Sequence, residues 1–279
     1  MKNYIGIDLG TTNSAVSAYD GENLRLFKSP DQNDVTPSAI FIDKRGNKYV
    51  GKRAYDNAAR NPENAATLFK RLMGTSTPVK LPAVDLTMTP EECSAEILRV
   101  LFGYLPEEIR NDPDTGTVIT VPAAFNQMQK DATMAAAEMA GLGKVALMQE
   151  PVAAVMSVMR HRKGDGMFLV YDLGGGTLDI AIAESISGRV SLLAHGGIAM
   201  CGGRDFDRIL LDNVVKPWLL ENFDLPEDFS SHKRYATLRH MATWAAEKAK
   251  IDLSSSDEAV VTLDDSELRV RDEAGVDIY

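Results

Sequence analysis

Two distant stretches of this sequence repeat one short pattern, and this repeat limits the possible folds more than any other feature. An apolar run at 5–7 leads into Asp-Leu-Gly-Thr-Thr at 8–12, and another at 168–171 leads into Asp-Leu-Gly-Gly-Gly-Thr at 172–177. Each turn is followed by an alternating segment typical of a second strand. A strand–turn–strand unit used twice predicts two similar lobes that face each other.

The composition of the two turns favours phosphate binding. Glycine lets the backbone approach a bulky anion and point several N–H groups into one concavity, and threonine hydroxyls add donors. Asp8 and Asp172 would repel phosphate by themselves, so we expect a Mg²⁺ ion between them and the phosphates. One such turn alone is also compatible with an ordinary hairpin. The pair, each after an apolar strand, favours a clamp around a di- or triphosphate.

Strand-like and helix-like segments alternate along the chain, which predicts an α/β fold. A helix is expected near 89–105 behind a Thr cap, and a second near 126–140 that ends at Gly141, a residue suited to a left-handed cap. A third is expected at about 151–164, and the turn at 163–166 marks the expected lobe boundary. The predicted strands are 4–7, 15–19, 39–42, 117–121, 167–171, 178–183 and 190–195.

Composition and charge disfavour several classes of function. The net charge of −10 argues against nucleic acid and anionic membranes as partners, because both attract clustered cations. Cys93 and Cys201 lie far apart without ligand-like neighbours, so we expect no disulfide framework and a reducing compartment. The N-terminus lacks the pattern of a signal peptide, and no apolar run approaches the roughly 20 residues that span a bilayer. We therefore expect a cytoplasmic protein that binds neither nucleic acid nor membrane.

Seven motifs, taken together, are typical of one family. They are DLGTTNS at 8–14, TPS at 36–38, FKRLMG at 69–74, VPAAFN at 121–126, EPVAA at 150–154, DLGGGTLDIAI at 172–182 and GGRDFD at 202–207. In these motifs the sequence resembles the nucleotide-binding region of the heat-shock protein 70 (DnaK-type) chaperones, in order from its first residues to about Ser256. The resemblance implies the actin-like ATPase fold, an α/β fold of duplicated ribonuclease H-like lobes with mixed sheets flanked by helices.

The resemblance also implies a domain plan. Lobe I would comprise residues 1–165, with an inserted subdomain at about 37–112, and lobe II would comprise residues 166–279. Lobe II would divide into a phosphate-binding subdomain at 166–205 and a helical and strand subdomain at 206–279. We expect lobe II to be incomplete, because the glycine-rich turn that supplies the other half of the family's adenine pocket has no equivalent in this sequence. The family's peptide-binding domain is likewise expected to be absent.

By resemblance, the chemistry of ATP hydrolysis falls to residues of both turns and of two motifs between them. Lys70 would reach the γ-phosphate and orient the attacking water, although outside its motif such a Lys would be read as a solvated surface charge. Glu150 would complete an acidic inner shell, and as an acid at a helix start it also suits the helix dipole. The carboxylates would hold Mg²⁺ through its waters, and the family's site also takes K⁺. The expected catalytic residues are Lys70, Thr11, Glu150, Asp172 and Thr177, and the expected metal-binding residues are Asp8, Asp172 and Asp179.

ATP or ADP would contact both turns and one helix face. Gly202 and Gly203 are expected to open a helix whose N-terminus can receive phosphate. Within the helix predicted at 244–256, four residues share a face by their i, i+3, i+4, i+7 spacing; spacing alone favours an exposed salt-bridged face, whereas similarity to the family's adenosine segment favours nucleotide. The expected cofactor-binding residues are Gly10, Thr11, Thr12, Asn13, Gly174, Gly175, Gly176, Thr177, Gly202, Gly203, Glu247, Lys250, Ile251 and Ser254.

Four positions depart from the family's usual residues. Ala124 stands for Tyr, Lys130 for Arg, Ala146 for Arg and Gln149 for Asn. Lys loses the planar fork of Arg, and the two Ala residues remove side chains altogether. We therefore expect weakened or specialised coupling to nucleotide state and an altered docking surface for a J-domain co-chaperone.

The expected function is that of the ATP-binding and ATP-hydrolysing region of a DnaK-type chaperone. Its nucleotide state would control binding and release of unfolded polypeptides by a C-terminal domain, and a J-domain co-chaperone and a nucleotide exchange factor would be further partners. We expect a monomer. An actin-like filament protein, a sugar kinase and a nucleotide-binding chaperone-like protein with little turnover stay open, because the fold alone does not decide between them.

Overall fold

The structure, a computed structural model, describes residues 3–162, 164–263 and 270–278. The central sheet of its N-terminal half contains β1 (Tyr4–Asp8), β2 (Asn13–Tyr19), β3 (Leu24–Phe27), β4 (Thr36–Pro37), β10 (Gly116–Val121) and β11 (Val145–Gln149). The strands follow the order β11-β10-β1-β2-β3, and β4 pairs with β2 beside this path. β1 runs parallel to β10 and antiparallel to β2, so the sheet is mixed.

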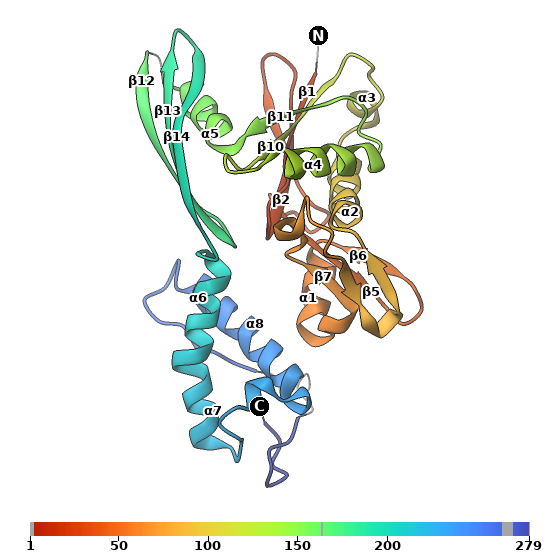
Figure 1. The fold of residues 1–279 in the computed structure, drawn as a ribbon, viewed down its shortest axis with the longest axis vertical. Coiled ribbons are helices and arrows are strands. Elements are labelled where there is room, and N and C mark those ends of the chain that lie inside the picture. Colours follow the sequence, from red (N-terminus) through yellow and green to blue (C-terminus); the bar gives the residue numbers. More distant parts are fainter. Residues whose placement is uncertain (1–2, 163, 264–269, 279) are drawn as a thin grey trace.

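Helices cover one face of this sheet and enclose the larger hydrophobic core (Figure 1). They are α2 (Pro90–Gly103) and α4 (Gln127–Met139), which pack against each other, with the short α3 (Glu107–Arg110) between them in the chain. Alternate residues of β1 and β10 point into the core, where Ile7 and Ile119 meet Ile97 and Leu101 of α2. The apolar stripe of α2 and the alternation of the strands therefore meet in one core.

The ends of the two covering helices agree with their predicted signals. At the start of α2, the side chains of Thr89 and Glu92 each accept a hydrogen bond from the other's backbone N–H, at 3.1 and 2.7 Å. At the end of α4, Gly141 adopts a φ of 77°, and the N–H of Leu142 donates to the carbonyl of Ala137 at 3.1 Å. This reciprocal cap and this left-handed end satisfy backbone groups that the helices leave unpaired.

The segment between β4 and α2 forms a small sheet and a hairpin beside the central sheet. The helix α1 (Lys52–Arg60) packs against all three strands of the small sheet, and α2 contacts β5 and β6. The small sheet has the order β6-β5-β7, and β8 and β9 form the hairpin. These strands are β5 (Ala39–Ile42), β6 (Lys48–Val50), β7 (Ala65–Thr67), β8 (Val79–Leu81) and β9 (Leu86–Met88).

A second sheet holds the second copy of the repeated pattern. It contains β12 (Gly166–Leu173), β13 (Thr177–Ile186) and β14 (Arg189–Ala199), all antiparallel. The two Asp-Leu-Gly turns thus both join antiparallel strands, β1 to β2 and β12 to β13, which confirms the predicted repeat. All seven predicted strands are present.

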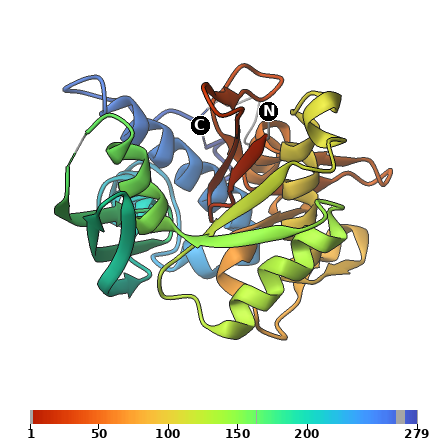
Figure 2. The ribbon, with the colours of Figure 1, turned by 90° about the horizontal axis from the view of Figure 1, so that it is seen from above.

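One helix, α5 (Glu150–Met159), lies between the two sheets and contacts strands of both (Figure 2). It ends at Met159, whereas the prediction placed its end near Gly164, so that prediction was wrong at this boundary. The residues after Met159, starting with Arg160 and His161, are polar, so no apolar face continues the helix. Lys163, at the predicted lobe boundary, lies outside the described residues.

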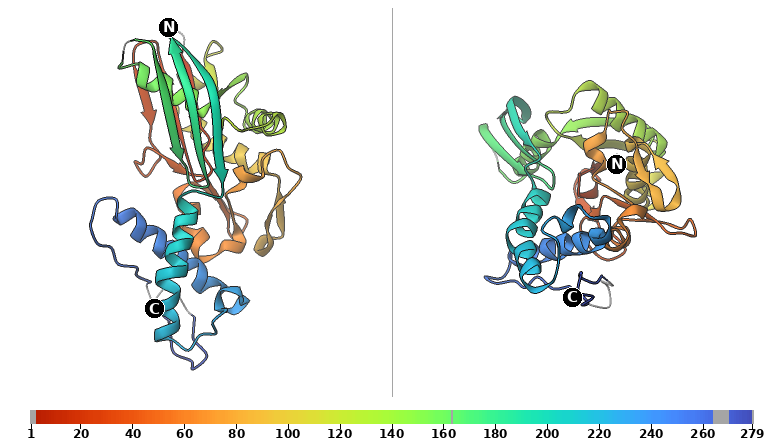
Figure 3. Two further views of the ribbon diagram at one scale, coloured as in Figure 1. Left: turned by 60° about the vertical axis from the view of Figure 1, so that its left-hand side comes forward. Right: turned by 60° about the horizontal axis from the view of Figure 1, so that its bottom comes forward.

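Helices dominate the C-terminal part, where the second sheet continues directly into α6 (Figure 3). They are α6 (Gly203–Leu210), a π-helical turn at Leu211–Val215, α7 (Lys216–Asn222) and α8 (Ala236–Asp252), around a second core that includes Leu219, Phe229, Leu238 and Met241. α8 also packs against α1 of the N-terminal half. After Asp252, the described residues at 253–263 and 270–278 add only an isolated bridge between Arg271 and Asp277. No helix in the described part of the chain combines the length and the apolar character needed to cross a membrane.

Candidate active site

The first Asp-Leu-Gly turn is held by hydrogen bonds from two serines. The N–H of Gly10 donates to Ser14 Oγ at 3.1 Å, and Ser38 Oγ donates to the Gly10 carbonyl at 2.8 Å. The N–H of Ser38 also donates to the Thr12 carbonyl at 2.7 Å. A Cβ at Gly10 would lie 1.9 Å from the carbonyl oxygen of Asn13, so only glycine fits there. Thr11 and Thr12 therefore stand on a rigid turn.

The second turn is held by the start of α6. The N–H groups of Gly203 and Arg204 donate to the carbonyls of Gly174 and Gly175, each at 3.0 Å. The N–H of Gly174 in turn donates to the carbonyl of Thr177 at 2.9 Å. Gly203 thus lies beside the turn as expected, but its N–H already has an acceptor in the protein. Its contact with phosphate stays a prediction.

Gly202, the other glycine expected at this helix start, precedes α6 and approaches the same turn closely. Its N–H donates to Asp205 Oδ2 at 2.9 Å. A Cβ at Gly202 would lie 2.5 Å from the backbone nitrogen of Gly176. The close approach of the two backbones explains why this position needs glycine.

The two turns face each other across the halves of the molecule. A Cβ at Gly175 would lie 1.8 Å from Thr12 Oγ1, so the second turn packs directly on the first. Thr12 Oγ1 is buried and has no hydrogen-bond partner among the described residues. An unsatisfied hydroxyl at the junction of two glycine-rich turns is a donor suited to a phosphate oxygen.

Carboxylates gather around this junction. Asp8, which accepts a hydrogen bond from Thr120 Oγ1 at 2.9 Å, lies in β1, and Asp172 faces Asp179 across β12 and β13. Burial raises the pKa of Asp172, and the charges of Asp179 and Asp8 raise it further. Thr177 Oγ1 donates to Asp179 Oδ2 at 3.0 Å. The mutual repulsion of these carboxylates is relieved by a cation.

The carboxylates are of the kind that holds a hydrated magnesium ion. Within the described ranges, no three His, Cys, Asp or Glu side chains converge closely enough to ligate a metal together. Magnesium usually keeps several of its waters and takes one or two carboxylates plus phosphate oxygens. Asp8 and Asp172, on opposed turns, are suited to hold such an ion through its waters.

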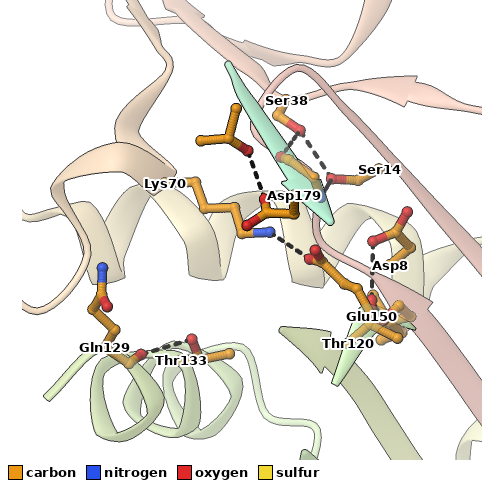
Figure 4. Close-up of polar contacts among 12 residues, drawn as sticks. Asp8, Ser14, Ser38, Lys70, Thr120, Gln129, Thr133, Glu150 and Asp179 are labelled. Carbon is orange, nitrogen blue, oxygen red and sulfur yellow. Dashed lines mark hydrogen bonds and ion pairs between the residues drawn. The ribbon is translucent and has the colours of Figure 1, made fainter. Parts of the chain in front are cut away.

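Lys70 and Glu150 form a buried ion pair beside these carboxylates (Figure 4). Lys70 Nζ lies 3.0 Å from Glu150 Oε1, and the two side chains are only 8% and 18% exposed. Lys70 stands in a short 3-10 turn, Phe69–Leu72, and Glu150 is the first residue of α5. Burial raises the pKa of Glu150, the charge of Lys70 opposes this shift, and Asp8 and Asp172 add to it. The ammonium thus lies next to the acidic junction.

The expected adenosine residues separate into two pairs. Glu247 accepts a hydrogen bond from the Tyr55 hydroxyl and lies 3.6 Å from Arg204 Nη1. Lys250 Nζ lies 2.5 Å from the fully buried Asp207 and donates to the Gly203 carbonyl at 2.9 Å. Both residues therefore lie beside α6 and the second turn.

Ile251 and Ser254, the other expected adenosine residues, are exposed to solvent. The helix predicted over 244–256 ends at Asp252, so Ser254 lies beyond α8 and the prediction of one continuous helical face was wrong. The N–H of Ser254 donates to the Ile251 carbonyl in a turn. A run of three serines competes with the helix for backbone hydrogen bonds, which accounts for this earlier end.

Comparisons with known proteins agree with this geometry. The family model described as Hsp70 protein matches residues 4–81 and 75–277. The chain belongs to the Hsp70 family. A chaperone protein dnaK from Cyanophora paradoxa is 37% identical over an alignment of 284 positions, which covers 94% of this chain and 45% of that protein. The chain therefore spans about half the length of the curated relative it matches.

Membership of the Hsp70 family accounts for the architecture. Proteins of this family bind nucleotide and are in general ATPases, and the mixed α/β structure with helix-flanked sheets is consistent with their actin-like ATPase fold. The predicted family and fold class are thus confirmed.

Several residues of this Hsp70 site were not among the predicted ones. Ser14 and Ser38 fix the first turn, and both lie in motifs that pointed to the family. Arg71 and Tyr55 make contacts between the two halves, with Gly176 and Glu247, whereas Arg204 pairs with Glu247 inside the C-terminal half. Arg71 and Arg204 lie inside two of the family motifs, but the partners of all three residues lie far away in the sequence, so no local pattern predicted these contacts.

Proposed function

We propose that this chain is the Mg²⁺-dependent ATP-hydrolysing region of a DnaK-type chaperone. One observation carries the proposal: the buried Lys70–Glu150 pair lies next to Asp8 and Asp172, which come from two glycine-rich turns on opposite halves. Hydrolysis of a γ-phosphate depends mainly on positioning the attacking water and on neutralising charge. A buried ammonium between two acidic phosphate turns supplies both.

The first turn would bind the phosphates through its backbone and its hydroxyls. Gly10 to Asn13 form this turn and the start of β2, and Thr12 Oγ1 is a buried donor without a partner among the described residues. Gly174 to Thr177 would close on the phosphates from the other half. Tight packing of Gly175 on Thr12 supports a site in which both turns contact one ligand.

Lys70 would donate to the γ-phosphate and orient the attacking water. Glu150 holds the ammonium at 3.0 Å and so fixes its position in a buried place. Asp8, Asp172 and Asp179 would hold Mg²⁺ through the water molecules bound to the ion. K⁺ would bind in the same acidic region. When bound, Mg²⁺ would neutralise phosphate charge that these carboxylates would otherwise repel.

The nucleoside would lie against α8 and the start of α6. Glu247 and Lys250 lie beside Gly203 and Arg204, close to the second turn. We propose that Glu247 binds the ribose and that the exposed Ile251 and Ser254 line the outer edge of the adenine site. Glu247 then exchanges its contact with Tyr55 or Arg204 for one with the sugar.

The activity of the whole protein is part of the same proposal. Nucleotide state would control the capture and release of unfolded polypeptides, with a J-domain co-chaperone and a nucleotide exchange factor as partners and a monomer as the working form. Two lobes, 1–165 and 166–279, with subdomains at about 37–112, 166–205 and 206–279, would move against each other during this cycle. Both cysteines are free, which agrees with a reducing cytoplasm as the proposed location.

Single-turnover hydrolysis of ATP, with and without Mg²⁺, tests the proposal. We expect hydrolysis that needs Mg²⁺, that is lost in Lys70→Met and reduced in Asp8→Asn, and that is unchanged in Asp212→Asn, a matched change at an exposed position. Calorimetry of ATP binding separates loss of binding from loss of turnover. The proposal fails if the wild-type chain neither binds nor hydrolyses MgATP, or if Asp8→Asn and Asp212→Asn behave alike. Polymers that sediment only with nucleotide would favour an actin-like filament protein instead.

A further inference from the structure

Arg71 follows Lys70 in the same 3-10 turn, but its side chain contacts the other half of the molecule. Its Nη2 donates to the carbonyl of Gly176 at 3.0 Å, and its Nη1 lies 3.7 Å from Met200 Sδ. Gly176 belongs to the turn between β12 and β13, and Met200 directly follows β14. One guanidinium of the N-terminal half therefore contacts two segments at the end of the second sheet where its glycine-rich turn lies.

The guanidinium packs tightly on this turn. A Cβ at Gly176 would lie 2.5 Å from Arg71 Nη2 and 2.6 Å from its Nε. Arg71 Nε is buried and has no hydrogen-bond partner among the described residues. The side chain is therefore not a solvated surface charge, and it keeps one buried donor that no described protein group accepts.

The backbone near both ends of this contact adopts an uncommon conformation. Leu68, two residues before Lys70, has a φ of 58°, and Met200 has a φ of 62°. Non-glycine residues are uncommon in this region, and they persist where the surrounding structure requires them. The conformation of Leu68 orients the segment that carries Lys70 and Arg71, and the conformation of Met200 orients the segment that Arg71 contacts.

We propose that Arg71 is a positioning residue for ATP hydrolysis. It fastens the Gly174–Thr177 turn to the segment that carries Lys70, and so fixes Thr177 and Asp172 relative to the Lys70 ammonium. The inference rests on the proposed function, because it names a residue that assembles that same site. When the two halves separate, Arg71 loses Gly176, so closure and assembly of the site are one event.

The planar fork of arginine matters here more than its charge. Two nitrogens of one rigid group reach two segments of the second half, whereas a lysine ammonium is a single point on a flexible stem. Arg71→Lys would keep the charge near the phosphates and lose the double contact. Arg71→Lys therefore distinguishes a positioning role from a simple electrostatic one.

Single-turnover hydrolysis and amide hydrogen exchange on the 279-residue chain test this role. We expect Arg71→Gln and Arg71→Lys to slow hydrolysis on the order of 10-fold to 100-fold, as a small misplacement of reacting groups does. The dissociation constant of ATP should change by less than about threefold, since binding energy from the other contacts remains. In the nucleotide-free protein, amides 174–177 should exchange faster in both variants.

Matched variants complete the test. Gly176→Ala disrupts the same contact from the turn, because the added methyl group displaces the guanidinium. We expect the double variant Arg71→Gln, Gly176→Ala to hydrolyse ATP little more slowly than Arg71→Gln alone. Arg99→Lys is the control: Arg99 also donates to a backbone carbonyl, that of Met139 at 2.9 Å, but this contact joins α2 to the end of α4 inside the N-terminal half. Gly103→Ala is the glycine control, because its added Cβ meets no atom within 4 Å.

Two results would overturn the inference. One is hydrolysis in Arg71→Lys at the wild-type rate, and the other is unchanged exchange of amides 174–177 in Arg71→Gln. A wild-type chain without hydrolysis would instead overturn the proposed function and, with it, the role of Arg71 in the reaction. Faster exchange in Arg71→Gln would still establish the contact between the halves in that case.

Discussion

Lys70 and Glu150 lie 80 positions apart in the sequence, yet their charged groups are 3.0 Å apart and shielded from water. Each would be costly to bury alone, because a charge in a poorly hydrated place needs a partner. The pair joins the 3-10 turn of Lys70 to the start of α5, the helix between the two sheets. It is thus both a structural link and the centre of the proposed chemistry.

Lys70→Met should abolish hydrolysis and also destabilise the protein. Removing one partner of a buried ion pair leaves the other charge unpaired, at a cost of roughly 3 kcal/mol or more. Glu150 would then face Asp8 and Asp172 without the opposing ammonium. Urea unfolding at pH 7 measures the change in stability, and single-turnover hydrolysis measures the loss of activity.

A second variant separates these two effects. Lys70→Met combined with Glu150→Gln removes both charges, so we expect most of the lost stability to return while activity stays absent. If the double variant is no more stable than Lys70→Met, the ion pair is not the source of the destabilisation. Arg99→Met is the control, because it removes the exposed partner of an ion pair, that with Glu96.

Tyr55→Phe should loosen the contact between α1 and α8. The Tyr55 hydroxyl donates to Glu247, and burial together with the charge of Glu247 raises the pKa of this hydroxyl far above its usual value. A hydrogen bond to a charged group contributes about 1.5–3 kcal/mol, less here because Arg204 still faces Glu247. Hydrogen exchange of α1 and α8 is the measurement.

The outcome expected for Tyr55→Phe is faster exchange on both helices without a change in the central sheet. Tyr19→Phe is the matched control, since its hydroxyl donates only locally, to the Gly21 carbonyl at 2.5 Å. Equal exchange in α1 and α8 for wild type and Tyr55→Phe would mean that the contact does not hold the halves together.

The repeated turns, the seven strands and the ends of α2 and α4 could be predicted because their signals are local. Thr89 and Gly141 act on backbone groups within a few residues, so sequence spacing is enough to find them. The same holds for Asp8 and Asp172, which each follow an apolar strand and which the fold brings to one junction. Local patterns were therefore a good guide to which segments come together at the junction.

Contacts between the halves could not be predicted in the same way. Tyr55 and Glu247 are 192 positions apart, and Arg71 and Gly176 are 105 positions apart. In the sequence, Arg71 is a charge beside another charge, and Tyr55 is an aromatic residue on a polar helix. Which of them is buried depends on how the N-terminal and C-terminal halves of the chain pack, and whole elements rather than sequence spacing decide this packing.

The two cysteines should differ strongly in reactivity. Cys93 is buried in α2, where burial and the neighbouring acids raise the pKa of its thiol to about 12. Only the thiolate reacts, so Cys93 should resist alkylation in the native protein. Cys201 is partly exposed beside the second turn and should react first. Mass spectrometry after iodoacetamide at pH 8 counts the labels.

The expected result is one label on native protein, at Cys201, and two labels in urea concentrated enough to unfold the protein. Cys201→Ser should then be unlabelled until it unfolds. Rapid native labelling of Cys93 would show that α2 opens readily, contrary to its place in the main core.

His240 should make the protein less stable in mild acid. It lies in α8 near Arg239 and Arg204, and burial, followed by these two positive charges, lowers its pKa below 6.5. The unfolded chain therefore binds a proton at a pH where the folded protein does not. Stability from the neutral imidazole is fully present above the unfolded pKa, near 6.5, and it is lost as pH falls toward the lower folded pKa.

His240→Gln, which cannot charge, tests this sign. We expect the urea midpoint of the wild type to fall between pH 7.5 and pH 5.5 by more than that of His240→Gln, whereas the exposed His161→Gln should follow the wild type. His240 lines the same small cavity as Tyr55 and Glu247, between α1 and α8. Part of the acid-induced loss should therefore appear as faster hydrogen exchange at that contact. A wild type and a His240→Gln variant with parallel pH curves would show that other groups cause the acid sensitivity.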